Sequence, residues 1–219
     1  MTSSRTIAIY LLPVLLFIAT SSFARQDDFE LNGTITPAIN GKAYLFYEGN
    51  FENKDSLVTE VKNGKFYFRE KMKGPVLTYL CIANSTIAGF HLENSRQHVN
   101  CSVTPMAGTD SVKLEINSVI GSNTENLKRE LKERLLNVNA ARDPEEQERI
   151  RFNILLNFVK DHKYSKASAW AIERAAIPPD QKLRLYRLLV KPLRDSYDGM
   201  LLKQTIEREK LQAGAAGKN

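Results

Sequence analysis

Apolar residues along this chain follow two different periods, and the change comes near residue 118. Between residues 29 and 116 they alternate with polar residues: in FELNGTI, Phe29, Leu31 and Gly33 share one side, and the period of two returns in GKAYLFYEG and KFYFREKM. Alternation of this kind is typical of strands that bury one face. About eight such segments, separated by Gly, Asn and Pro, favour an antiparallel β-sandwich or barrel-like module.

A turn signal lies between two of these segments. Asn63 and Gly64 separate DSLVTEV from KFYFREKM. A type I′ turn needs positive φ at both central residues, which Asn and Gly tolerate better than other residues. We therefore expect a tight hairpin at residues 63–64.

From residue 121 onward the apolar period becomes about 3.6, as in amphipathic helices. Leu127, Leu131 and Leu135 form the stripe of the first helix, and Ser122 with Glu125 predicts a capping box at its start. Short connections favour antiparallel packing of the helices. Further helices are predicted over residues 143–162, 165–176, 179–193 and 196–211.

The sequence predicts where two of these helices begin or end. Asp143 is the expected cap of the second helix, with Pro144 at its first helical position. In the last helix we expect Leu201 and Ile206 to pack against the preceding helix. Disorder is expected from Gln212 on, because the residues that follow are Gly, Ala, Lys and Asn.

Together these patterns predict an α+β fold: an N-terminal antiparallel β-sandwich or barrel-like module of about eight strands, followed by a C-terminal bundle of about five helices. The expected boundaries are a signal peptide over residues 1–24, a β-sandwich domain over 25–118, a helical domain over 119–212 and a flexible tail over 213–219.

The first residues have the layout of a secretory signal. MTSSR carries a positive charge, a run of fifteen uncharged residues follows, and Ser22 and Ala24 are the small residues before a cut after Ala24. An uncleaved anchor is the alternative, but the run is short for a membrane span and contains Pro13. We expect an exported, periplasmic protein with no stable membrane anchor after cleavage.

Charge and motifs exclude several functions. The 31 basic and 25 acidic residues are interspersed along the chain, whereas a nucleic-acid reader would need a one-signed face. No glycine-rich phosphate loop, dinucleotide fingerprint or GxSxG elbow is present. The sequence therefore predicts no catalytic residue, no cofactor and no nucleic-acid partner; a periplasmic protein or a small ligand is the expected partner, and the oligomeric state stays open.

The cysteines and histidines carry the remaining candidate chemistry. Cys81 and Cys101 are the only cysteines, and they allow two core thiols, a structural disulfide or a reactive pair, although no CxxC is present. His91 and His98 flank a turn and could ligate a metal with Glu93. Metal sites usually need a third or fourth ligand at a recognisable spacing, so no metal site is predicted.

Several segments resemble a known family. FELNGTI, GKAYLFYEG, DSLVTEVKNGKFYFREKMKGPVLTYL and FHLENSRQHVNCSV are similar to the β-rich domain of unknown function that precedes the thioredoxin-like domain in bacterial periplasmic thiol–disulfide interchange proteins. IGSNTENL, LLNFVKDHKYSKAS and LRDSYDGMLLKQTIEREK resemble its helical extension, with Lys163 at a position where the family has proline. The matching positions in the β-rich part are Phe29, Gly33, Asp55, Ser56, Gly64, Phe66, Phe68 and Pro75.

The resemblance implies that AGAAGKN is a linker to a thioredoxin-like domain, whose CxxC this sequence lacks. The chain is then either a natural stand-alone protein or a shortened gene product. We interpret it as a non-enzymatic binding or interaction module that uses a sheet face or the cleft between its two halves. The alternatives are a redox-linked protein acting through Cys81 and Cys101, a truncated oxidoreductase without its catalytic domain, and an assembly subunit that oligomerises through its helices.

Overall fold

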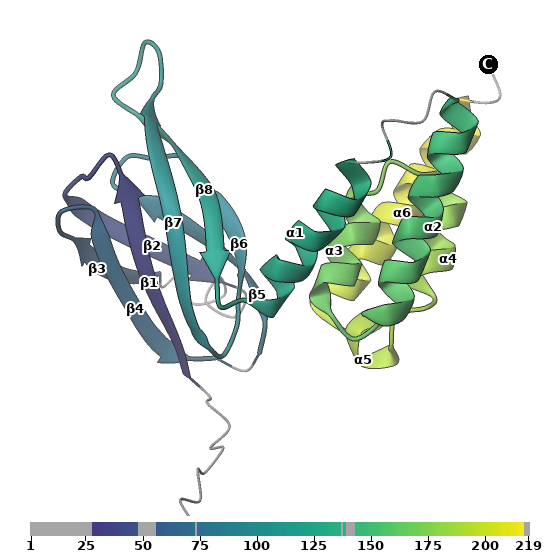
Figure 1. The fold of residues 1–219 in the computed structure, drawn as a ribbon, viewed down its shortest axis with the longest axis horizontal. Coiled ribbons are helices and arrows are strands. Elements are labelled where there is room, and N and C mark those ends of the chain that lie inside the picture. Colours follow the sequence, from purple (N-terminus) through teal and green to yellow (C-terminus); the bar gives the residue numbers. More distant parts are fainter. Residues whose placement is uncertain (1–27, 48–55, 73, 137, 139–142, 217–219) are drawn as a thin grey trace, which may run out of the picture.

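The structure is a computed structural model that describes residues 28–47, 56–72, 74–136, 138 and 143–216. Within these residues eight strands form two sheets and six helices follow, so the predicted α+β fold is confirmed (Figure 1). The predicted signal peptide, its cleavage site and Asp55 lie outside the described residues.

The strands form two four-stranded sheets that pack face to face. One sheet, called sheet A below, has the order β4 (Lys65–Lys71), β1 (Asp28–Thr36), β7 (Arg96–Pro105) and β8 (Val112–Ile120). The other, sheet B, has the order β3 (Leu57–Val61), β2 (Gly41–Tyr47), β5 (Val76–Ile82) and β6 (Ala88–Leu92). The sheets are not closed, so the module is a sandwich and not a barrel.

One strand pair differs from the predicted antiparallel arrangement. β1 pairs with β4 antiparallel, but it pairs with β7 in parallel, with Glu30 opposite Arg96. The other pairs between the described strands are antiparallel. Side chains alternate between the two faces in both kinds of pair, so the sequence pattern could not distinguish them.

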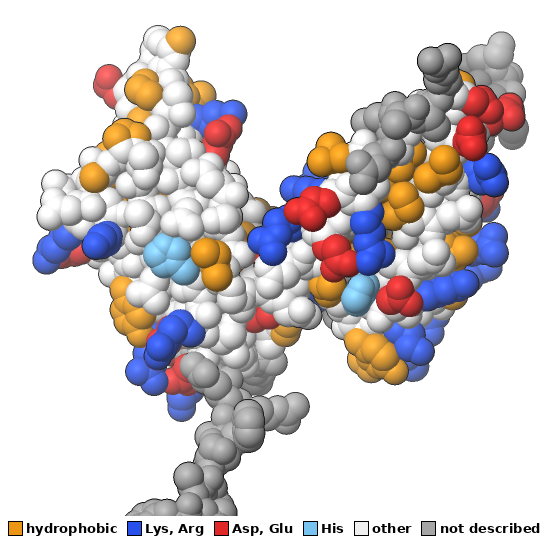
Figure 2. Space-filling model, in the orientation of Figure 1, with side chains coloured by type: hydrophobic (Ala, Val, Ile, Leu, Met, Phe, Trp, Pro, Cys, Tyr) orange, Lys and Arg blue, Asp and Glu red, His pale blue; other side chains and the backbone are white. Residues whose placement is uncertain are grey.

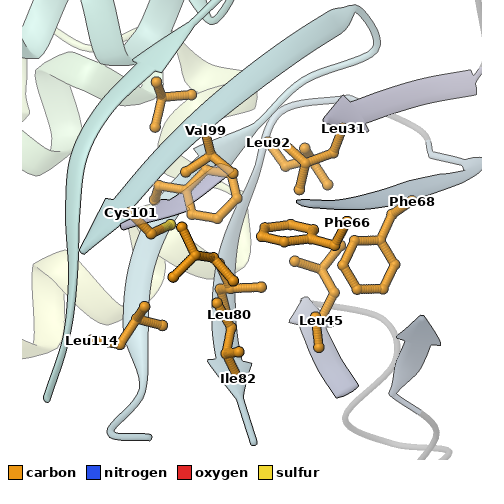
Figure 3. Close-up of a cluster of buried hydrophobic side chains, with 14 of the residues drawn as sticks. Leu31, Leu45, Phe66, Phe68, Leu80, Ile82, Leu92, Val99, Cys101 and Leu114 are labelled. Carbon is orange, nitrogen blue, oxygen red and sulfur yellow. The ribbon is translucent and has the colours of Figure 1, made fainter. Parts of the chain in front are cut away.

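The core of the sandwich lies between the two sheets, where the predicted apolar positions of each strand meet (Figure 3). Leu31 and Leu45 are fully buried, and Phe66 and Phe68 contact each other edge to face. Gly33 of β1 faces Phe66 of β4, and a Cβ at Gly33 would overlap the Phe66 ring. The glycine therefore makes the space in which the ring packs.

The predicted tight turn at Asn63-Gly64 is confirmed, but the strands beside it do not form a paired hairpin: they belong to different sheets and are joined by an isolated bridge between Lys62 and Lys65. Both residues have positive φ, 50° and 72°, and Lys62 and Lys65 exchange backbone hydrogen bonds of 3.0 Å. The turn joins β3 of sheet B to β4 of sheet A, so it connects the two layers of the sandwich. A Cβ at Gly64 would lie 2.7 Å from the carbonyl oxygen of Ile35, which adds a packing reason for glycine there.

The helices follow β8 and pack around a second core. Figure 1 shows them as a unit beside the sandwich, with α1 at the junction. Leu131, Leu155, Phe158, Ile172 and Leu185 are almost completely buried in this core. The bounds are α1 (Asn123–Leu136), α2 (Pro144–Asp161), α3 (Lys166–Arg174), α4 (Pro179–Tyr186), α5 (Lys191–Arg194) and α6 (Tyr197–Ala216).

The start of α2 is as predicted: the Asp143 side chain accepts a hydrogen bond from the Glu145 amide, and Pro144 follows the cap. The helix predicted over residues 179–193 is instead two helices, α4 and α5, so the described residues form six helices where about five were predicted. Pro192 lies in the first turn of α5. A proline cannot continue a helix because it lacks the amide hydrogen and its ring clashes with the carbonyl four residues earlier.

The last helix differs from the prediction in two respects. Leu202 and Ile206 are buried, whereas Leu201 is 44% exposed, so the predicted buried face was wrong at Leu201 by one position. The helix also continues to Ala216, past the predicted end at Leu211 and into the expected flexible tail. Gly214 did not end it; a glycine inside an exposed helix costs only about 1 kcal/mol relative to alanine.

Candidate functional site

The junction between the two halves begins at the capped end of α1. Ser122 accepts a hydrogen bond from the Glu125 amide at 3.1 Å, as the predicted capping box requires. Glu93, which follows β6, accepts hydrogen bonds from the amides of Asn123 at 3.1 Å and Thr124 at 2.7 Å. A carboxylate at a helix N-terminus accepts hydrogen bonds from amides that lack a partner within the helix, and it interacts favourably with the positive end of the helix dipole. Glu93 therefore connects the end of β6 to the start of α1 through hydrogen bonds.

A second carboxylate connects the same elements. Contrary to the prediction, the Glu125 side chain does not complete the capping box; it accepts hydrogen bonds from the His91 amide at 2.8 Å and the Lys128 ammonium at 2.7 Å. His91 Nδ1 also lies 3.2 Å from Glu125 Oε1. An ionised carboxylate only accepts hydrogen bonds, so Nδ1 carries the proton in this contact.

The environment of Glu125 favours its charged form. Burial opposes ionisation, but the hydrogen bonds from His91 and the positive charge of Lys128 together outweigh it and lower the pKa of Glu125 to about 2. The carboxylate is therefore ionised at neutral pH. Because it contacts both β6 and α1, it stabilises the position of α1 against the sandwich.

A cleft of about 390 Å³ opens beside this network. Its sandwich wall is the outer face of β5 and β6, where Leu77 lies opposite His91 and Tyr79 lies opposite Gly89. A Cβ at Gly89 would be 3.3 Å from the Tyr79 ring, so the glycine leaves room for the tyrosine. The inward residues of β5, such as Leu80, belong to the sandwich core, and the outward ones face the cleft.

The helical wall of the cleft comes from α1, α3 and α6. Trp170 of α3, the only tryptophan, lines it together with Leu201 of α6. An ion pair of 2.7 Å between Lys166 and Asp198 joins α3 to α6 at the same wall. The exposed Leu201 therefore has a place in the cleft, although it was predicted to be part of the core.

Positive charges surround the Trp170 ring. The ammonium groups of Lys128 and Lys132 lie 5.0 and 5.7 Å from the ring centroid, within the range of cation–π contacts. The pKa of Lys128 is lowered, first by burial and then by the charges of Lys132 and Arg174, although Glu125 acts in the opposite direction. Arg174 also lines the cleft, and no ion-pair partner is found for it among the described residues.

These side chains suit the binding of a small molecule. The volume is within the range of ordinary ligand sites, and aromatic, aliphatic and charged groups converge on it. None of the lining residues is a serine, threonine or cysteine that could act as a nucleophile. The ionisable groups deepest in the cleft, His91 and Lys128, are held by Glu125.

The histidines considered for a metal site are not brought together. His91 belongs to sheet B and binds Glu125, whereas His98 belongs to sheet A and lies near Thr34 and Asn100, at 3.2 and 3.0 Å. His162 is the C-terminal cap of α2, and its ring makes a tilted contact with the Phe158 ring. Within the part of the chain that the structure describes, no group of three or more His, Cys, Asp or Glu side chains could hold a metal ion.

The two cysteines are both free and belong to different sheets. Cys101 points into the sandwich core with Val99 and Val103, and its burial raises the pKa of the thiol to about 12 (Figure 3). Cys81 alternates with the buried Leu80 on β5, so it lies on the outer face of sheet B. This geometry gives no support to a bond or a redox pair between them, and the disulfide stays a sequence-based prediction.

Sequence reasoning anticipated a cleft between the halves but not its residues. Trp170, Arg174 and Lys128 come from helical segments whose pattern only separates a buried stripe from an exposed one. Their convergence on β5 and β6 depends on how α1 leaves the sandwich. The available signal was the single tryptophan on the short, alanine-rich segment SKASAWAIERAA.

The charged side chains of the face seen in Figure 2 are mixed in sign, with Lys and Arg beside Asp and Glu on both halves. The exclusion of nucleic acid stays a prediction. No helix within the described ranges has both the length and the apolar character needed to span a membrane.

Comparison with known proteins identifies one part of the chain. No curated protein and no solved structure matches it. One family model matches this chain from Phe29 in β1 to Asn126 in the first turn of α1, a segment that includes the sandwich, Glu93 and Glu125. The family is described as Domain of unknown function (DUF4369), and the match over residues 29–126 supports an uncharacterised β-rich domain in this part of the chain.

Proposed function

We propose that this protein is an exported, periplasmic, non-enzymatic binding module whose ligand occupies the cleft between sheet B and the helices. The observation that carries the proposal is the cleft itself: about 390 Å³, lined by Trp170, Tyr79 and Leu201 beside several charged groups. Concave sites with an apolar lining and a few convergent polar groups are the usual ligand sites of proteins.

The arrangement of the charged groups supports binding over catalysis. Lys128 and His91 are held by Glu125, and Lys166 is held by Asp198. Groups fixed in this way offer a preformed surface, which reduces the entropy that a ligand loses on binding. The resemblance to the domain that precedes a thioredoxin-like domain in thiol–disulfide interchange proteins supports a periplasmic partner or small ligand for the module.

A ligand screen with a cleft-filling variant tests the proposal. We expect compounds that bind to raise the melting temperature of the purified protein, because ligands that bind only the folded state stabilise it. Gly89→Leu should abolish these shifts by filling the cleft beside Tyr79. Gly214→Leu, where an added side chain meets no atom within 4 Å, is the matched control and should keep them.

Two results would contradict the proposal. Shifts that persist in Gly89→Leu would place the ligand elsewhere, and turnover of a bound compound would contradict the non-enzymatic role. Export is tested separately, by expressing the full chain in a bacterium and measuring the mass of the protein in the periplasmic fraction. A mature chain that begins at Arg25 is expected; a full-length cytoplasmic product would contradict export.

A further inference from the structure

We propose that the ligand of the cleft is a small amphipathic monoanion, a single carboxylate on an apolar body. The inference rests on the proposed function, since it names the class of ligand for the same cleft. It follows from the balance of charge and from the position of the apolar groups.

The cleft has one positive charge in excess. Lys128, Lys166 and Arg174 line it with the acidic residues Glu173 and Asp198. Adding the neighbours Glu125 and Lys132 does not change the balance, since one is acidic and the other basic. Lys166 is neutralised by Asp198 at 2.7 Å, and Lys128 by Glu125 at 2.7 Å. A monoanion would restore neutrality, whereas a cation would add to the repulsion.

The excess charge lies next to Trp170. Lys128 and Lys132 flank the ring, and the charge of Arg174 acts on Lys128 from α3. The guanidinium of Arg174 can bind a carboxylate through two parallel hydrogen bonds, and no ion-pair partner is found for it among the described residues. Figure 2 shows Lys and Arg side chains near α1, with Asp and Glu side chains beside them.

The apolar groups define the other part of the ligand. Leu77 of β5, Leu201 of α6 and the Trp170 ring line the cleft from both walls. Leu201 is 44% exposed, so it offers apolar surface that a bound ligand can cover. A ligand with an apolar body therefore removes this surface from water while its carboxylate meets Arg174.

The experiment compares three probes with the same apolar body: octanoate, octan-1-ol and octylamine, titrated by calorimetry and by the fluorescence of Trp170. We expect octanoate to bind about tenfold or more tightly than octan-1-ol, and octylamine to bind most weakly. The reason is that only the anion gains affinity from a charge-assisted hydrogen bond with Arg174. Raising the salt concentration should weaken the binding of octanoate and leave the affinity for octan-1-ol unchanged.

Two variants test whether the preference for octanoate depends on Arg174. Arg174→Gln should reduce octanoate binding to the level of octan-1-ol, and Arg208→Gln, on the exposed side of α6, is the control and should not. Equal binding of octanoate and octan-1-ol would overturn the anion preference while leaving the cleft as a binding site. If no probe binds, the amphipathic class is wrong, and the ligand screen with Gly89→Leu still decides the proposed function.

Discussion

The Glu125 carboxylate offers the sharpest test of how the two halves are held together, through the substitution Glu125→Gln. The amide keeps the shape of the side chain but not its charge. It therefore weakens the hydrogen bonds with His91 and Lys128, which are 2.8 and 2.7 Å long. Lys128 is then left as a buried charge without its counter-ion, so the stability of the junction should fall.

The magnitude follows from the pKa of Glu125. Its value falls from 4.5 to about 2 in the folded protein, and each pKa unit corresponds to roughly 1.4 kcal/mol. The ionised carboxylate therefore stabilises the folded state by about 3 kcal/mol at neutral pH. Because the folded pKa is the lower one, this contribution is complete above pH 4.5 and is lost as the pH falls towards 2. Between pH 6 and pH 3 it should decrease by about 2 kcal/mol.

The assay is urea unfolding at pH values from 6 to 3, followed by circular dichroism and by the fluorescence of Trp170, the only tryptophan. The difference in unfolding free energy between wild type and Glu125→Gln should shrink as the pH falls. Glu130→Gln is the control, since Glu130 forms an exposed pair with Arg134 on the same helix, and such pairs contribute about 0–1 kcal/mol. A difference that stays constant with pH, or equals that of the control, would refute the assigned role of Glu125.

Three further predictions concern the cores and the thiols. Gly33→Ala should lower the free energy of unfolding by roughly 1–3 kcal/mol, because its Cβ overlaps the ring that covers it; an unchanged urea midpoint would contradict this packing. Leu202→Ala should cost about 2–5 kcal/mol and Leu201→Ala less than about 1 kcal/mol, measured by thermal unfolding, and the reverse order would restore the sequence-based assignment. A thiol reagent at about pH 8 should leave Cys101 unmodified in the native protein, because its pKa of about 12 keeps it protonated, and should find two thiols in denaturant. Finding no thiol in denaturant would instead support a disulfide between Cys81 and Cys101.

Local patterns were sufficient for most elements of the fold. The alternation of Phe29 and Leu31, the Asn63-Gly64 turn and the Asp143 cap each depend on residues close in sequence, and the structure has all three. The capping box at Ser122 was half right, because Glu125 finds stronger partners on β6 and on its own helix.

The remaining features depend on contacts that no local pattern describes. Whether Leu201 or Leu202 faces the core depends on the rotation of α6 against α4 and α3, since both leucines fit an apolar stripe. The parallel partner of β1 depends on where the chain crosses between sheets. The cleft also depends on contacts between distant segments, because its walls place Tyr79 of the sandwich near Trp170 of the helices.

The position of β1 also determines when this protein can fold as its chain is made. β1 lies inside sheet A, and its residue Glu30 binds Arg96, which is 66 positions later in the sequence. Until the ribosome has synthesised β7, the backbone groups along one edge of β1 have no strand to pair with. An unpaired edge of this kind can pair with another chain and lead to aggregation. Pairings of such long separation are formed slowly, whereas the contacts of the helices are more local. We therefore expect completion of sheet A to limit the folding rate, and the unfinished edge of β1 to be the segment that most needs protection by chaperones.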